Sequence, residues 1–363
     1  MGKECNGCIA ALLFCLLLGV LPVKSEGPLA PALYVFGDSL VDSGNSNYLS
    51  TIVRANNPPY GVDFPGGATG RFTNGKTVAD FIAESLGLPL VPPDLSLSHI
   101  KRNETTTGIN YASGSAGILP DTGTLFGTNL NLESQIDMFE DSVTRNLPHK
   151  FQSSKELSQY LSKSIFLVDI GSNEFIPNLI SGQSINQQKK NPKDFAKLLT
   201  KTLSIHLQRL YELGARKFVV FEVGPIGCTP AMISNSSKGE CNQEINDSVT
   251  TYNKELSSLL KSLNSKLKGS SFSQAKIYAL WMLATEKAAK LGLTEDIVKS
   301  CCLGPSNGTL PCTSSQPSCK NANQFVYFDG LHPTEEVNSK VAEAVFSDSS
   351  VCSPVSIQEL VEA

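Results

Sequence analysis

Histidine and long hydrophobic runs are scarce in this chain. The 363 residues include 4 His and 1 Trp, and aromatic residues make up 7% of the sequence. No cysteine lies between Cys15 and Cys228, and the later cysteines show no paired C-x-x-C spacing. The pattern therefore disfavours a zinc site, and we expect neither a metal nor a cofactor.

Long basic tracts are absent too. The chain has 30 Lys and Arg residues against 34 Asp and Glu residues, a net charge of −4. This mildly acidic composition argues against nucleic acid as a partner. Beyond residue 25 no apolar run reaches the length of a membrane span, so we expect no integral membrane association.

The N-terminus has the pattern of a secretory signal peptide. Lys3 precedes an apolar run from Ile9 to Val20, and a short segment follows up to the small residue Ser25. This order predicts a signal peptide over residues 1–25, cleaved after Ser25, and hence a secreted, extracellular protein. The alternative is an uncleaved anchor, for which the apolar run is too short.

The remaining cysteines all lie in the second half of the chain and predict disulfides. Cys301 and Cys302 are adjacent, so we expect them to pair with different partners. The count is odd, which leaves one thiol unpaired, and the connectivity stays open. The seven residues are Cys228, Cys241, Cys301, Cys302, Cys312, Cys319 and Cys352.

Four N-x-S/T sequons predict N-linked glycans. In a secreted chain such sequons indicate surface loops that carry the glycans. They begin at Asn103, Asn235, Asn246 and Asn307.

Apolar runs alternate with segments of helical periodicity along the chain, which predicts an α/β fold with a mainly parallel sheet. We expect one domain over residues 26–363. Strands are predicted over residues 32–36, 164–170, 217–223 and 276–280. Helices are predicted near residues 78–86, 132–139, 157–161, 195–213, 241–268 and 335–346.

The first predicted strand leads directly to a candidate nucleophile. Gly37 allows a sharp turn, and Ser39 then lies at the carboxyl end of the strand, where open α/β sheets bind ligands. A serine there can act as a nucleophile if the chain supplies a base and an oxyanion site. The alternative is an ordinary turn in which Gly, Asp and Ser serve as turn and cap residues.

His332 is the best candidate for the base. It follows a predicted extended segment, and Asp329 three residues earlier can curl back to the same imidazole. The other histidines lie in polar loops or beside a helix whose leucines already account for its core. The order Ser, Asp, His also occurs here without the G-x-S-x-G motif of α/β-hydrolases.

One motif match is misleading. Residues 70–77 fit the phosphate-loop pattern G-x-x-x-x-G-K-[ST], but the Pro- and Gly-rich segment before them cannot be a central strand. We instead place Lys76 at a helix start, and we do not expect nucleotide binding.

Taken together, the motifs resemble those of the plant-type GDSL esterases/lipases of the SGNH hydrolase superfamily. The resemblance covers nearly the whole mature chain, in the expected order. The matching stretches are FGDSLVDSGN (36–45), the loop 58–76, NYASGSAGI (110–118), IGSNEF (170–175), FEVGPIGC (221–228) and FDGLHPTE (328–335).

The resemblance implies a three-layer α/β/α, flavodoxin-like fold and ester hydrolysis through an acyl-enzyme. Ser39 would be the nucleophile, His332 the general base and Asp329 its orienting acid. The oxyanion would be held by the Ser39 amide, the Gly114 amide and the Asn173 side chain, with Gly117 as the alternative glycine. Glu174 departs from the family, which usually has Asp after the Asn, and this bears on how Asn173 is supported.

Three functions are consistent with these features. The favoured one is a secreted carboxylic ester hydrolase that acts on a small-molecule or lipid ester. An acyltransferase would use the same Ser39 to pass the acyl group to an alcohol other than water. A secreted glycoprotein that binds lipid or carbohydrate without turnover is the third, and the intact Ser39, Asp329, His332 and Asn173 argue against it.

Overall fold

The described part of the chain contains one five-stranded sheet with the strand order β1-β2-β3-β4-β5. A computed structural model describes residues 27–176, 191–286 and 299–363; the predicted signal peptide, residues 1–25, lies outside them. Strands β1 to β4 are parallel, and β5 runs antiparallel to β4 at one edge. The strands are β1 (Leu33–Gly37), β2 (Ile165–Asp169), β3 (Lys217–Phe221), β4 (Ser271–Ala275) and β5 (Cys352–Ser353).

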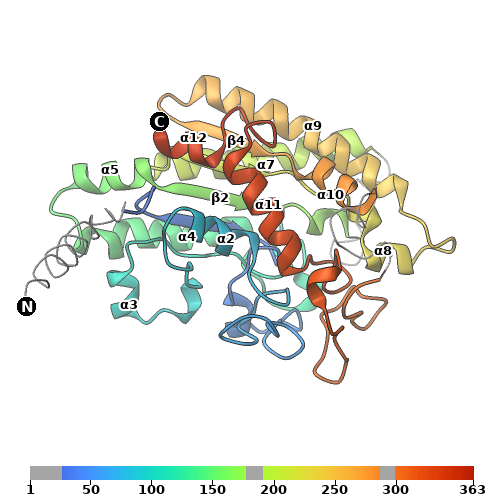
Figure 1. Cartoon of the computed structure of the whole chain (residues 1–363). Helices are drawn as coiled ribbons and strands as arrows, with labels where there is room; N and C mark the ends of the chain where they lie inside the picture. The colour runs from blue at the N-terminus through green and yellow to red at the C-terminus, as the bar shows by residue number, and fades with distance from the viewer. Residues whose placement is uncertain (1–26, 177–190, 287–298) are drawn as a thin grey trace, which may run out of the picture.

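Helices cover both faces of this sheet, which makes the three-layer α/β/α arrangement seen in Figure 1. Within the described ranges none of them is long and apolar enough to cross a membrane. The helices are α2 (Val78–Ser85), α3 (His99–Glu104), α4 (Leu132–Asp141), α5 (Ser154–Lys163), α7 (Pro192–Glu212), α8 (Pro230–Ser234), α9 (Gln243–Lys266), α10 (Ile277–Glu286), α11 (Glu335–Ser347) and α12 (Ile357–Glu362).

The two faces of each strand belong to different hydrophobic cores, because successive side chains point to opposite sides. Tyr34 and Phe36 of β1 pack with Phe139 of α4, in the core that also contains the apolar faces of α7 and α9. Leu33 and Val35 lie in the other core, with residues of α2, α11 and α12. Burial on both faces explains why the first three strands read as continuous apolar runs.

A segment beside β1 determines where the sheet binds ligands. Residues 107–113 run parallel to the free edge of β1, since Leu33 N–H donates to Thr107 O and Tyr111 N–H donates to Val35 O. The chain therefore leaves β1, passes through α2 to this edge, and returns over α4 to β2 on the other side of β1. Such a reversal opens a crevice at the carboxyl end of the strands.

The prediction of a fourth strand over residues 276–280 was wrong. Lys276 precedes α10 and residues 277–280 form its first turn, where the Glu222 carboxylate accepts the Tyr278 N–H at 2.7 Å and so satisfies one of the helix's first donors. The strand lies just before, at Ser271–Ala275, with polar residues that are buried because they find partners: Ser273 Oγ donates to Val355 O at 2.7 Å. The short edge strand β5 and the helices α10 and α12 were not predicted either.

The seven cysteines in the described part of the chain form three disulfides and leave one thiol. Cys301 and Cys302 pair with different partners, as expected, and Cys352 is buried and free. The pairs are Cys228–Cys241, Cys301–Cys319 and Cys302–Cys312.

The sequon at Asn246 does not lie in a surface loop, contrary to prediction. Asn246 belongs to α9, is 2% exposed, and its Oδ1 accepts the Gly227 N–H at 2.9 Å. A glycan on this buried nitrogen is incompatible with the fold. Asn235 and Asn307 are exposed, and Asn103 is partly exposed.

The loop that resembles a phosphate-binding motif has a structural role. The Arg71 guanidinium makes two hydrogen bonds of 2.7 Å to the Asp80 carboxylate, and both side chains are buried. Asp80 also forms the capping box of α2 with Thr77, so the ion pair fixes the loop to the start of that helix. Lys76 lies beside this helix start, as predicted, and pairs with Glu84 near the surface.

Asp80→Asn is expected to destabilise the protein by about 3–5 kcal/mol, because it leaves the buried Arg71 charge without its carboxylate. Glu84→Gln breaks the half-exposed Lys76 pair and is the matched control, with an expected cost of about 0–1 kcal/mol. Chemical denaturation measures both. Equal costs for the two variants would contradict the importance of the buried pair.

Candidate active site

Ser39 lies in the turn that follows β1, and close packing holds this turn in place. A Cβ atom at Gly37 would meet the Asp169 carbonyl oxygen at 2.4 Å, so the glycine is required for close approach to β2. The Gln135 side chain makes two bonds of 2.8 Å to the Gly37 backbone, and Asp38 N–H donates to Asp169 O. The Ser39 side chain is thereby directed to the carboxyl edge of the sheet.

The rest of the FGDSLVDSGN motif ties this turn to the edge segment. The Asp42 carboxylate accepts the backbone N–H groups of Gly44, Asn45 and Ser46. Asn110 Nδ2 donates to Val41 O at 2.7 Å, and Asn45 Nδ2 donates to Asn110 O at 2.9 Å. These bonds pair the turn after β1 with residues 110–118.

His332 and Asp329 come from the loop that precedes α11. Asp329 Oδ1 accepts the backbone N–H groups of Leu331 and His332, both at 2.8 Å, so the carboxylate turns the chain back on itself. His332 Nδ1 lies 2.8 Å from Asp329 Oδ2 and 2.9 Å from Oδ1. His332 Nε2 lies 2.7 Å from Ser39 Oγ, across 293 residues of sequence.

The electrostatics of this row of side chains suit a base and its orienting acid. Burial acts to raise the pKa of Asp329, but attraction to His332 and its hydrogen bonds outweigh burial and hold that pKa below its usual range. Asp329 therefore stays ionised beside the imidazole. A serine hydroxyl within hydrogen-bond reach of an imidazole that a carboxylate orients can be activated as a nucleophile.

Asn173 follows β2 at the same sheet edge. Its Nδ2 donates one hydrogen to Ala116 O at 2.8 Å, and the same nitrogen carries a second hydrogen. Glu174 supports this arrangement, since its Oε1 accepts the N–H groups of Ile118 and Leu119 at 2.6 and 3.1 Å. Burial raises the pKa of Glu174 to about 7. The longer Glu side chain therefore anchors the segment on which Asn173 rests.

Gly114 lies near this edge, but its N–H is engaged. It donates to Ser46 Oγ at 2.8 Å and to Asp42 Oδ2 at 3.1 Å. Ser115, the next residue, borders the cavity with Ser39 and adopts a left-handed backbone with φ of 59°. A non-glycine residue in this conformation is held there by its surroundings, as is common at active sites.

A cavity joins these groups. Ser39, Asn173, Ser115 and His332 supply its polar part, next to Asp38 and Asp329. The remaining wall is largely apolar and comes from several loops; it includes Leu40, Val53, Ile176, Ile226, Leu310 and Leu331. A polar reacting end beside an apolar wall suits a substrate with an acyl chain.

The other histidines do not take part in this site. His99 begins α3, His149 lies in a surface turn, and His206 is buried in α7. In residues 27–176, 191–286 and 299–363 no cluster of three His, Cys, Asp or Glu side chains could hold a metal ion.

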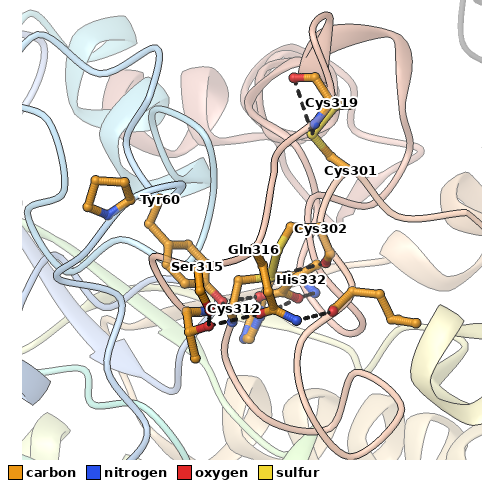
Figure 2. Close-up of a disulfide and its surroundings, with 12 residues drawn as sticks. Tyr60, Cys301, Cys302, Cys312, Ser315, Gln316, Cys319 and His332 are labelled. Carbon is orange, nitrogen blue, oxygen red and sulfur yellow. Dashed lines mark hydrogen bonds and ion pairs between the residues drawn. A yellow bond between two sulfur atoms is a disulfide. The ribbon is translucent and has the colours of Figure 1, made fainter.

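Sequence reasoning missed two residues at the site. Tyr60 donates to Asp329 Oδ2 at 2.7 Å, and Figure 2 shows it beside Cys312 and His332. It falls within the matching loop 58–76, but nothing in the loop's composition indicates a contact with a residue so distant in sequence. Ser115 was not predicted, because its motif NYASGSAGI also contains Gly114 and Gly117, and glycine allows the closest approach to a ligand.

Comparisons with known proteins show the family to which the chain belongs. The model of the family described as GDSL-like Lipase/Acylhydrolase matches residues 33–345. The chain is 42% identical to GDSL esterase/lipase 7 of Arabidopsis thaliana over 361 residues, which cover 96% of this chain and 99% of that protein. It is 37% identical to GDSL esterase/lipase At1g71691 of the same plant, over 92% of this chain and 86% of that protein. The chain thus belongs to the GDSL lipase/acylhydrolase family and is a carboxylic ester hydrolase.

Proposed function

We propose that the protein is a secreted serine esterase or lipase that hydrolyses esters of acyl lipids or related compounds through an acyl-enzyme. The observation that carries the proposal is the 2.7 Å contact between Ser39 Oγ and His332 Nε2, with Asp329 at 2.8 Å on the other ring nitrogen. Ser39 is the nucleophile, His332 the general base and Asp329 the acid that orients the imidazole.

In the first half-reaction, Ser39 Oγ attacks the ester carbonyl carbon and His332 Nε2 takes the hydroxyl proton. The tetrahedral intermediate collapses, the bond to the alcohol breaks, and the alcohol leaves with that proton. Water then attacks the acyl-Ser39 ester with His332 again as the base, which releases the carboxylic acid. Asp329 keeps the imidazole oriented and stabilises its charged form.

The oxyanion needs hydrogen-bond donors that are already in place. The Ser39 amide and the second hydrogen of Asn173 Nδ2 are proposed as two of them. For the third, the engaged N–H of Gly114 makes the Ser115 amide the better candidate, since Ser115 borders the cavity. Gly117 is less suitable, because a Cβ atom there would meet Glu174 Oε1 at 2.4 Å, which indicates tight packing against that side chain.

An acyltransferase remains the second candidate, because the same acyl-enzyme can be attacked by an alcohol other than water. The apolar cavity wall supports either reaction, since both begin with an acyl ester. Assays with p-nitrophenyl esters and acyl lipids, with and without added alcohols, distinguish them. A transferase yields a new ester as the main product, whereas an esterase yields the free acid.

Secretion rests on the N-terminal sequence and on the cysteines. Residues 1–25 are proposed as a cleaved signal peptide, with residues 26–363 as one hydrolase domain. The three disulfides are typical of a protein that folds outside the cytosol.

A fluorophosphonate is expected to label Ser39 covalently. His332→Ala should abolish both labelling and ester hydrolysis, because the hydroxyl is a weak nucleophile without its base. His206→Ala is the matched control, since His206 is buried to a similar extent in α7 and should leave both readouts intact. Mass spectrometry locates the label, and a label on another serine would refute the assignment.

Asn173→Ala should lower kcat by about 10²–10³ and change KM little, because the amide bonds strengthen chiefly in the transition state. Asn173→Asp should be at least as damaging, because a carboxylate repels the developing oxyanion. Asn253→Ala serves as the control: Asn253 is a buried amide that makes two bonds to the Val223 backbone. Steady-state kinetics on a short acyl ester measure kcat and KM, and thermal unfolding shows whether each variant is folded. A folded Asn173→Ala enzyme with wild-type kcat would remove Asn173 from the site.

The secreted protein is expected to begin near Glu26 and to lose mass on deglycosylation. Asn235→Gln and Asn307→Gln should each remove a glycan because these asparagines are exposed, whereas Asn246→Gln should not change the mass of the glycans. N-terminal sequencing and gel mobility are the measurements. Full-length protein in the cytosol with every thiol titratable would contradict secretion.

A further inference from the structure

Tyr60 links the loop between Cys302 and Cys312, which a disulfide closes, to the Asp329 carboxylate. The tyrosine is 1% exposed, and its hydroxyl donates to Asp329 Oδ2 at 2.7 Å. The same hydroxyl accepts the backbone N–H of Cys312 at 2.9 Å. Both hydrogen-bonding functions of the phenol are therefore used, one on Asp329 and one on Cys312, whose disulfide with Cys302 is seen in Figure 2.

The loop is anchored on the other side of Asp329 as well. Cys302 is the disulfide partner of Cys312, and its N–H donates at 2.7 Å to the carbonyl of Phe328, the residue before Asp329. One half of the disulfide thus holds the backbone beside Asp329, and the other half holds the phenol that binds its side chain.

Aromatic packing fixes the phenol ring in this position. The Tyr60 ring centroid lies 5.5 Å from that of Phe328 and 6.0 Å from that of Phe72. Phe72 in turn lies 5.0 Å from the His332 imidazole. Burial, together with the nearby Asp329 charge, raises the pKa of Tyr60 well above its usual value, so the hydroxyl remains a donor throughout the working pH range.

The two carboxylate oxygens of Asp329 are held differently. Oδ1 accepts two backbone N–H groups and lies 2.9 Å from His332 Nδ1, whereas Oδ2 lies 2.8 Å from that nitrogen and accepts the Tyr60 hydroxyl. The phenol therefore adds a constraint on the carboxylate that comes from outside the turn at 329–332.

We propose that Tyr60 is a positioning residue that transmits the constraint of the Cys302–Cys312 loop to Asp329, and through it to His332. This inference rests on the proposed function of the triad. It assigns the disulfide-closed loop a part in catalysis in addition to the wall that Leu310 contributes to the cavity.

Tyr60→Phe tests the proposal, since it removes the hydroxyl and keeps the ring. We expect kcat to fall about 10- to 100-fold, the range of a hydrogen bond to a charged group, with KM little changed. The phenol also withdraws negative charge from Asp329. Its loss strengthens the attraction for protonated His332, so the acidic limb of the kcat/KM profile should move to higher pH. Asp38, the other carboxyl that acts on His332, is the same in both enzymes.

Tyr111→Phe is the matched control. Tyr111 is fully buried, and its hydroxyl bonds to Ser142 Oγ at 2.9 Å, apart from the triad. A merely structural effect of losing a buried hydroxyl would appear in both variants. Only Tyr60→Phe should lower kcat and move the pH profile; an unchanged profile, or equal losses of kcat in the two variants, would overturn the proposal.

A double-mutant cycle tests the contribution of the loop. Cys302→Ala with Cys312→Ala should lower kcat in the wild-type background and have little further effect in Tyr60→Phe, because both changes release the same carboxylate. Independent, additive losses would overturn the link between loop and triad. If the disulfide variant does not fold in a thermal scan, the comparison of Tyr60→Phe with Tyr111→Phe decides.

Ser39→Ala separates this inference from the proposed function. An active Ser39→Ala enzyme would refute the triad itself. An inactive Ser39→Ala enzyme together with an unaffected Tyr60→Phe enzyme would refute only the role of Tyr60.

Discussion

The Asp329 carboxylate is the charge on which the site depends. A buried carboxylate is costly unless hydrogen bonds and an opposite charge replace its hydration. Here two backbone N–H groups, the Tyr60 hydroxyl and the His332 imidazole supply that replacement. The donors to this anion come from the turn at 329–332 and from Tyr60 in the loop 58–76. Tyr60 in turn contacts the loop that the Cys302–Cys312 disulfide closes. The imidazole is consequently held at the position where it meets Ser39.

The other half of the site follows from the sheet. Residues 107–113 lie on one side of β1, and β2 lies on its other side. The turn after β1 therefore opens into the crevice between residues 107–113 and β2. Ser39, Ser115 and Asn173 follow β1, the edge segment and β2 in turn, so three separate turns meet at one place. His332 and Asp329 come from a loop near the C-terminus. The sheet edge and the cross-linked loop together position Ser39 Oγ 2.7 Å from His332 Nε2.

Much of this could be predicted from sequence where the signal is local. The first three strands are continuous apolar runs, and Ser39, Asp329 and His332 are residue types whose order and flanking motifs point to one chemistry. β4 was not predicted because its residues are largely polar. They can be buried because they form hydrogen bonds to residues far along the chain, such as that of Ser273 to Val355. The Tyr60–Asp329 bond spans 269 residues and leaves no local pattern. The sequon at Asn246 is a three-residue pattern and contains no information about the packing of α9.

The buried carboxyls in and near the site fall into two groups by the direction in which their pKa values shift. Burial, with repulsion from Asp169, raises the pKa of Asp38 well above its usual value, and burial raises that of Glu174 to about 7. The pKa of Asp329 is lowered instead, because its interactions with His332 exceed the cost of burial. The pKa values of these two carboxyls thus shift in opposite directions: that of Asp329, beside the imidazole, goes down, and that of Asp38, beside Ser39, goes up. Opposite pKa shifts in neighbouring titratable groups are typical of sites that carry out acid–base chemistry, which fits the roles proposed for Asp329 and His332.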